Sequence, residues 1–207
     1  MSDYKFTKDW FSWAPEVWQQ LIPLLPARKR FLEIGSFEGR STVWTMEHML
    51  EDDGTIVCID TWEGGEEHKA SGENMSEAEQ NFDHNMALIK EQFPLRHVHK
   101  CKKTSYYGLV AQAEYIRNLE GKDGKDRHFD FIYVDGSHIA RDVLTDTCIA
   151  WQLLKKDGIM VFDDYAWGNP RDPLHRPKPA IDAFTNIFAE ELVPIHTHYQ
   201  LIVRKAV

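Results

Sequence analysis

Hydrophobic and polar positions along the chain follow two patterns that alternate. Short continuous apolar runs are typical of strands buried on both faces of a sheet. Apolar residues spaced every three or four positions predict helices instead. Because the two patterns follow one another through most of the chain, we predict an α/β fold with a mostly parallel sheet. The apolar runs lie at 31–34, 55–59, 97–101, 129–134 and 159–162.

Helical stripes separate these runs. The Ser76-x-x-Glu79 pattern is a capping box that predicts the start of one helix, which Pro94 ends. Gly121 and a charged turn are expected to close the next helix, and two polar stretches, 61–75 and 168–179, are expected to be loops. The inward residues of the predicted helices are Val43, Met46 and Leu50; Phe82, Met86 and Ile89; Leu109, Ala113, Ile116 and Leu119; Ile139, Val143, Thr147, Ala150, Trp151 and Leu154; and Ile181, Phe184 and Phe188.

The C-terminal end departs from the alternation. Two apolar segments, 193–197 and 199–203, follow each other with only His198 between them, close enough to form an antiparallel hairpin. We therefore predict a doubly wound Rossmann-like sheet, mostly parallel with an antiparallel C-terminal strand, and helices on both faces. With no internal repeat or linker, 1–207 is expected to be one domain, in which an aromatic cap segment (1–28) precedes the core (29–207).

Composition narrows the class of protein. The chain has 207 residues, 43% of them hydrophobic, which is enough for a sizeable core. A net charge of −9 argues against a nucleic-acid partner. No apolar stretch approaches the ~18 to 20 residues of a membrane helix, and the N-terminus does not resemble a signal peptide. Three widely spaced cysteines favour free thiols over a disulfide framework, so we expect a cytoplasmic protein.

The first strand runs into a glycine loop, Glu33-Ile34-Gly35-Ser36-Phe37-Glu38-Gly39. Glycines let the backbone approach a ligand, and the start of the following helix offers unpaired N–H groups. The loop differs from the Gly-x-Gly-x-x-Gly pattern of dinucleotide folds and carries an acid where phosphates would lie. It therefore favours a nucleoside ligand without phosphate and disfavours a nicotinamide dehydrogenase.

Acidic residues follow the predicted strands at the edge where ligands bind in open α/β sheets. These residues could simply cap the next helices. For Asp60 we favour a ligand role, because an acid one strand from the glycine loop can accept both hydroxyls of a ribose. Glu33 is expected to orient the loop through backbone N–H groups or to reach an amino group of the ligand. The acids at the strand ends are Glu33, Asp60, Asp135, Asp163 and Asp164.

The glycine loop, Asp60 and the acid after the fourth strand resemble those of the class I S-adenosylmethionine (SAM)-dependent methyltransferases. Residues 129–138 (FDFIYVDGSH) and 158–165 (GIMVFDDY) resemble the family-24 group, which is similar to macrocin- and cephalosporin-type O-methyltransferases. The resemblance implies a seven-stranded sheet and SAM as the cofactor. Thr104 and Ser105 are candidate adenine neighbours by position alone. The expected cofactor-binding residues are Glu33, Gly35, Ser36, Gly39, Ser41, Asp60, Thr61, Thr104, Ser105 and Asp135.

Three of the acids form a candidate metal site. Asp135, Asp163 and Asp164 should meet at adjacent strand ends, where a cation would offset their repulsion. Oxygen ligands suit Mg²⁺ or another oxygen-preferring divalent cation. Similar catechol-type O-methyltransferases bind Mg²⁺ at corresponding positions, although Asp164 stands where they carry an amide. Alternatively, Asp163 and Asp164 cap the next segment and Asp135 touches the cofactor.

His138 is the candidate catalytic base. It lies three residues after Asp135, where catechol-type relatives carry a catalytic lysine, and an imidazole titrates near neutral pH. It could instead hold Asp135 in place or bind the metal. The crowded aromatics Trp10, Phe11, Trp13 and Trp18 could cover the mouth of the site, or pack in the core or at an interface.

These features together favour metal-assisted O-methylation of a small-molecule hydroxyl with SAM. The alternatives are a metal-independent N- or O-methyltransferase and a SAM-binding protein without catalysis. A homodimer is compatible with the sequence, which does not decide the oligomeric state.

Overall fold

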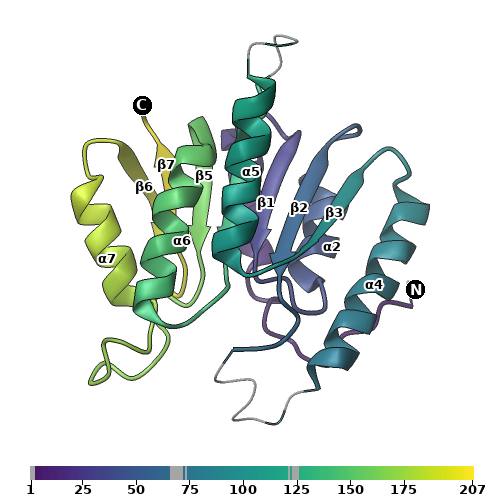
Figure 1. The fold of residues 1–207 in the computed structure, drawn as a ribbon, viewed down its shortest axis with the longest axis horizontal. Coiled ribbons are helices and arrows are strands. Elements are labelled where there is room, and N and C mark those ends of the chain that lie inside the picture. Colours follow the sequence, from purple (N-terminus) through teal and green to yellow (C-terminus); the bar gives the residue numbers. More distant parts are fainter. Residues whose placement is uncertain (1–2, 66–71, 73, 121, 123–125) are drawn as a thin grey trace.

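The computed structural model describes residues 3–65, 72, 74–120, 122 and 126–207. Within them, seven strands form one sheet in the order β3-β2-β1-β4-β5-β7-β6 (Figure 1). β7 is antiparallel to both of its neighbours, and every other pairing is parallel, so the predicted fold class is confirmed. The strands are β1 (Arg30–Ile34), β2 (Thr55–Asp60), β3 (His97–Lys102), β4 (Phe129–Val134), β5 (Leu154–Phe162), β6 (Leu192–Thr197) and β7 (Leu201–Lys205).

Helices cover both faces of the sheet (Figure 1). α5 (Ser105–Leu119), α6 (Ala140–Leu153) and α7 (Lys178–Ile187) pack on one face. α1 (Pro15–Trp18), the short 3-10 helix η1 (Gln19–Leu24), α2 (Arg40–His48) and α4 (Met75–Gln92) cover the other.

The alternation of side chains along β1 explains how one strand serves both layers. Leu32 and Ile34 join the core under α5, α6 and α7, while Phe31 joins the core on the opposite face. A strand that is apolar on both faces must be covered on both, as the sequence pattern indicated. No helix in the described part of the chain is long and apolar enough to cross a bilayer.

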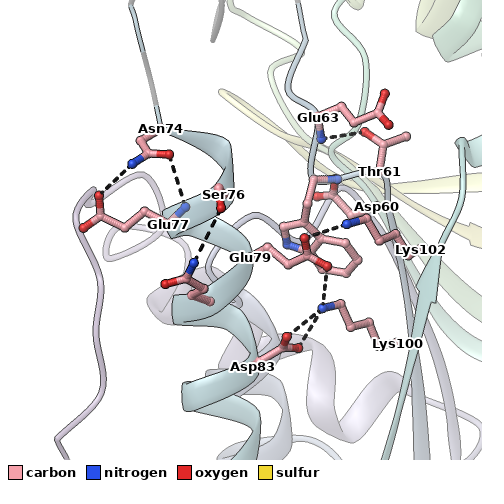
Figure 2. A network of polar contacts seen from close by, with 12 residues as sticks. Asp60, Thr61, Glu63, Asn74, Ser76, Glu77, Glu79, Asp83, Lys100 and Lys102 are labelled. Carbon is pink, nitrogen blue, oxygen red and sulfur yellow. Dashed lines mark hydrogen bonds and ion pairs between the residues drawn. The ribbon is translucent and has the colours of Figure 1, made fainter.

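The start of α4 corrects one prediction. Asn74, not Ser76, is the N-cap: its side chain accepts from the backbone N–H of Glu77 at 3.4 Å and donates to the Glu77 carboxylate (Figure 2). Ser76 lies within the first turn. The local sequence offers two overlapping capping boxes, Asn74-x-x-Glu77 and Ser76-x-x-Glu79. The Glu79 carboxylate forms salt bridges to β3, so it does not complete the second box.

Other element bounds differ by a few residues. β5 begins at Leu154, before the expected start, and its pairing with β4 shifts register between Phe129 and Phe131. α5 begins at Ser105, so its first turn lies at the carboxyl end of β3. The predicted hairpin is present as β6 and β7. Gly121 and most of the 66–73 part of the expected first loop lie outside the described residues.

The aromatic segment before β1 divides between two places. Trp18 is a core residue: it packs edge-on against Phe131 and Tyr133 and donates its indole N–H to Gln200 Oε1 at 2.9 Å. Residues 3–14 have no helix or strand, and they run beside the glycine loop. The division of the chain into a cap (1–28) and a core (29–207) within one domain stays a prediction.

Candidate active site

The glycine loop follows β1 and is held between two neighbouring strands. Gly35 N–H donates to Ile59 O at 2.8 Å, and Asp135 N–H donates to Ile34 O at 2.8 Å. Gly35 has φ +83°, and a Cβ at this position would lie 1.9 Å from Asp135 O. Only glycine allows the loop to pass this close to the end of β4. The loop therefore depends on Gly35 for both its conformation and its position.

Asp60, at the end of β2, fastens the glycine loop. Its Oδ2 accepts from the backbone N–H groups of Ser36 at 2.8 Å and Phe37 at 3.0 Å, and its Oδ1 accepts from Trp62 N–H at 2.7 Å. The acid that the sequence places at a ribose therefore holds the glycine loop in its conformation.

Glu33 is buried below the glycine loop, whereas Asp60 lines the cavity. Glu33 is 1% exposed and accepts from the hydroxyls of Ser41 at 2.7 Å and Thr42 at 2.9 Å. These partners are side-chain hydroxyls of α2, not the backbone N–H groups that the sequence suggested. Burial raises the pKa of Glu33 to about 7, and the two hydroxyls partly oppose this rise.

Glu33 should therefore make stability depend on pH. Between its ordinary pKa of 4.5 and its folded pKa of about 7, the folded chain keeps a proton that the unfolded chain releases. Raising the pH through this window should destabilise the fold by up to about 3 kcal/mol. Glu33→Gln should remove this pH dependence. The unfolding free energy of the variant should therefore rise relative to that of the wild type between pH 4.5 and 7. Urea unfolding across this range measures the difference, and parallel pH curves would contradict it.

Glu38, the acid of the glycine loop that argued against a phosphate ligand, also shapes the site. Its carboxylate, 2% exposed, accepts from the backbone N–H of Thr7 at 2.6 Å and from the Thr7 hydroxyl at 2.8 Å. Asn81 of α4 donates to the same carboxylate at 2.9 Å. Glu38 therefore ties residues 3–14 to the glycine loop and to α4.

A single cavity of about 770 Å³ opens at the carboxyl ends of these strands. It joins nearly all of the predicted site residues. Glu33 and Gly39 do not line it: Glu33 is buried beneath the loop, and Gly39, with φ +76°, shapes the start of α2. The predicted residues that line the cavity are Gly35, Ser36, Ser41, Asp60, Thr61, Thr104, Ser105, Asp135, His138, Asp163 and Asp164.

One corner of the cavity gathers carboxylates and an imidazole. Asp135, His138 and Asp164 each offer a ligand atom, and these atoms all lie within 4.8 Å of one another. His138 Nε2 is 2.8 Å from Asp164 Oδ2, and the Tyr199 hydroxyl donates to Asp164 Oδ1 at 2.6 Å. Burial, followed by the charges of Asp163 and Asp164, raises the pKa of Asp135 well above its usual range.

Asp163 lies at the back of this corner. The Tyr133 hydroxyl donates to it and also lies 3.0 Å from Asp135 Oδ2, while Asp164 N–H donates to Asp163 Oδ1 at 2.8 Å. Burial and the adjacent Asp164 raise the pKa of Asp163 to about 6. Of the three acids expected to bind a metal, Asp135 and Asp164 group with His138, and Asp163 faces Tyr133.

The donor set of this corner fits a divalent cation. Two carboxylates suit Mg²⁺ or Mn²⁺, and an imidazole nitrogen is a ligand that Mn²⁺ accepts more readily than Mg²⁺. A cation would also offset the repulsion among the buried acids.

Aromatic side chains form a wall of the cavity that extends from Phe37 of the glycine loop to His138. Trp10 packs against Phe37 with ring centroids 5.0 Å apart, and Trp13 meets Tyr199 edge-on at 5.1 Å. Trp167 packs against His138 at 4.3 Å. All of them line the cavity, and so does Phe11. Trp10 and Trp13 are exposed side chains of the cavity lining, whereas Phe11 is 6% exposed and also packs in the core, so each of the two expectations for this segment holds for part of it.

The sequence did not single out Phe37, Trp167 or Tyr199. Tyr133 also went unnoticed, although a hydroxyl within a buried strand is a signal that a polar partner lies at the strand end. The cations of the 168–179 loop do not line the cavity: Lys178, for example, pairs with Asp182 at 2.8 Å.

A mostly parallel sheet of this order, with a glycine loop and an acid at neighbouring strand ends, is typical of Rossmann-like proteins that bind a nucleoside cofactor. The model of methyltransferase family 24, described as "Methyltransferase domain", matches residues 32–165. The chain belongs to this family and is a class I SAM-dependent methyltransferase. No curated protein matches its sequence.

Solved structures share the fold at low sequence identity. The O-methyltransferase TomG from Streptomyces achromogenes, in complex with SAM, is 19% identical, with a TM-score of 0.61 over 93% of this chain and 79% of TomG. An O-methyltransferase from Bacillus cereus, in complex with S-adenosylhomocysteine (SAH), is 16% identical, with a TM-score of 0.63 over 98% of this chain and 84% of the Bacillus cereus chain. MycE of the mycinamycin biosynthetic pathway, in complex with Mg and SAH, is 16% identical, with a TM-score of 0.58 over 96% of this chain and 51% of MycE.

Proposed function

We propose that this methyltransferase transfers the methyl group of SAM to a hydroxyl of a small molecule, assisted by a divalent cation. One observation carries the proposal. The cavity that begins at the glycine loop and Asp60 continues without interruption to Asp135, His138 and Asp164. A cofactor on the loop and an acceptor at the corner would therefore share one cavity.

SAM would lie along the glycine loop. Gly35 and Ser36 offer backbone at the cavity wall, Asp60 would face the ribose, and Thr104 and Ser105 would lie beside the adenine near the start of α5. Asp60 already accepts three backbone N–H groups, so its carboxylate is held in place before the ribose arrives.

His138 would take the proton of the acceptor hydroxyl at Nδ1, because Nε2 is the ring nitrogen that pairs with Asp164. The sulfonium of SAM is a good leaving system, so the enzyme mainly aligns an in-line attack and keeps water out. An alcohol must also lose its proton, and His138 lies in the cavity for this task. Asp164 Oδ2, 2.8 Å from Nε2, would stabilise the imidazolium that forms.

A divalent cation would be held by Asp135 and Asp164, with Asp163 or His138 completing the set. When bound, it would acidify and orient the hydroxyl of the acceptor. The MycE complexes, which contain Mg and SAH and in one case mycinamycin VI, support a cation and a small-molecule acceptor in a protein of this fold.

The acceptor would occupy the part of the cavity nearest the aromatic wall. Trp10 and Trp13 are 51% and 40% exposed, so their rings can be covered by a bound molecule. This arrangement suits a small acceptor with a flat or apolar face beside its hydroxyl.

Metal removal tests the proposal. We would screen hydroxylated small molecules for methyl transfer from radiolabelled SAM, with and without Mg²⁺ or Mn²⁺. With an accepted substrate, exhaustive EDTA treatment should lower turnover at least about tenfold, and added cation should restore it. Full activity after EDTA would reject the cation.

One observation favours a second candidate, a metal-independent methyltransferase. The His138–Asp164 pair is already formed at 2.8 Å and could accept a proton without a cation. Comparing amine and hydroxyl acceptors in EDTA separates the two candidates. A homodimer, a cytoplasmic location and the absence of nucleic-acid partners stay predictions.

A further inference from the structure

Trp62 follows the ribose-side acid Asp60 and has an unusual conformation. Its backbone has φ +52°, a left-handed value that is rare for a bulky side chain, and its side chain is buried at 3% exposure. The residue does not line the cavity, although Thr61 and Gly64 on either side do. Something in the surrounding structure must hold this backbone in place.

Hydrogen bonds from Trp62 connect the two loops of the cofactor side. Its backbone N–H donates to Asp60 Oδ1 at 2.7 Å, and its indole N–H donates to Phe37 O at 2.8 Å. Asp60 Oδ2 in turn accepts from Phe37 N–H at 3.0 Å. A closed ring of hydrogen bonds therefore runs from Asp60 through Phe37 to Trp62 and back. Both backbone polar groups of Phe37 are therefore hydrogen-bonded: its N–H donates to Asp60 and its carbonyl oxygen accepts from Trp62.

The indole ring is fixed from outside by α4 and β3. It packs against Phe82 with centroids 4.8 Å apart, and the Lys100 ammonium lies 4.6 Å from the ring centroid. Lys100 is itself held by Glu79 at 2.9 Å and Asp83 at 2.8 Å, as Figure 2 shows. A cation over an indole face is attracted to it, so this network secures the ring.

We propose that Trp62 is a positioning residue for the cofactor. Through its indole N–H, Trp62 sets the spacing between Asp60 and the glycine loop. The inference rests on the proposed placement of SAM at this loop. Trp62 acts through Phe37 and Asp60 and does not touch the cofactor. Its effect should therefore appear in cofactor affinity and leave the methyl-transfer step nearly unchanged.

Trp62→Phe tests the proposal, because phenylalanine keeps an aromatic ring and removes the indole donor. We expect SAH affinity, measured by isothermal titration, and KM for SAM to weaken about tenfold, the effect of one well-placed hydrogen bond. The turnover number at saturating SAM should stay within about twofold of wild type.

Trp151→Phe is the matched control. Trp151 is also fully buried and also donates its indole N–H, to Glu191 at 3.1 Å, but it lies in α6 away from the cavity. It should lose stability to a similar extent and bind SAH like wild type. Equal SAH affinity in Trp62→Phe and Trp151→Phe would overturn the inference, as would a fall in turnover with KM unchanged.

Lys100→Met removes the cation above the ring and leaves Trp62 in place. We expect SAH affinity to fall about two- to threefold, within the usual range of an exposed cation–π contact. Unchanged affinity would overturn the part assigned to Lys100. If the wild-type protein itself did not bind SAH, the cofactor site and with it this inference would be rejected, an outcome distinct from wild-type binding that Trp62→Phe does not alter.

Discussion

Gly35→Ala is expected to abolish SAH binding and to lower the free energy of unfolding by more than about 3 kcal/mol. Two costs combine at this position. A Cβ would lie 1.9 Å from Asp135 O and 2.6 Å from Asp135 C, which are backbone atoms that cannot turn aside. The backbone also has φ +83°, which alanine adopts only under strain.

Gly72→Ala separates the two costs. Gly72 has φ +74°, and a Cβ there would meet no atom of the described residues within 4 Å. Gly72→Ala should therefore lower the free energy of unfolding by only about 1 kcal/mol and leave SAH binding unchanged. Urea unfolding and isothermal titration of both variants give the comparison. Similar losses in the two variants would mean that backbone strain, and not the contact with Asp135, determines the requirement for glycine at position 35.

His138→Ala is expected to lower the turnover number about 10²- to 10⁴-fold, the usual contribution of a general base. SAH affinity should change little, because the imidazole faces Asp164 and Trp167 at the end of the cavity that we propose for the acceptor. Steady-state kinetics at saturating SAM and titration of SAH measure the two quantities. Unchanged turnover would reject the role of base.

His138 could act as a metal ligand instead, and cation dependence distinguishes the roles. A lost ligand weakens cation binding, so excess Mg²⁺ or Mn²⁺ should restore the activity of His138→Ala; a lost base cannot be restored in this way. His175→Ala serves as the control, because His175 is exposed and pairs with Asp172 at 2.9 Å, outside the cavity lining. Its turnover should match wild type.

The fold could be predicted from the sequence because its signals are local. The run at 129–134 reads as a strand buried on both faces and has these bounds in the structure. The glycine loop and the acids after β2, β4 and β5 then meet at one edge, since the carboxyl ends of parallel strands in a doubly wound sheet share that edge. The predicted helix start at Ser76 was wrong, because two overlapping capping patterns are equally good locally and Asn74 is the N-cap in the structure.

Within the site, the sequence determined which residues come together, and the tertiary structure decided what each side chain contacts. Asp163 and Asp164 are adjacent in the chain, yet one faces Tyr133 and the other His138 and Tyr199. Successive side chains leave a strand end in different directions, and the partners they meet are set by other elements.

The aromatic wall depended on the tertiary structure most of all. It joins Trp13, near the start of the chain, to Tyr199, near its end, and no local pattern relates the two. The glycine loop was evident from the sequence, but the burial of Glu33 and the support from Trp62 were not. By itself the sequence determined the fold and the edge of the sheet where the cavity lies, because spacing and periodicity are local. Side-chain direction, burial and long-range contacts, and with them the shape and charge of the site, were decided only when the chain packed.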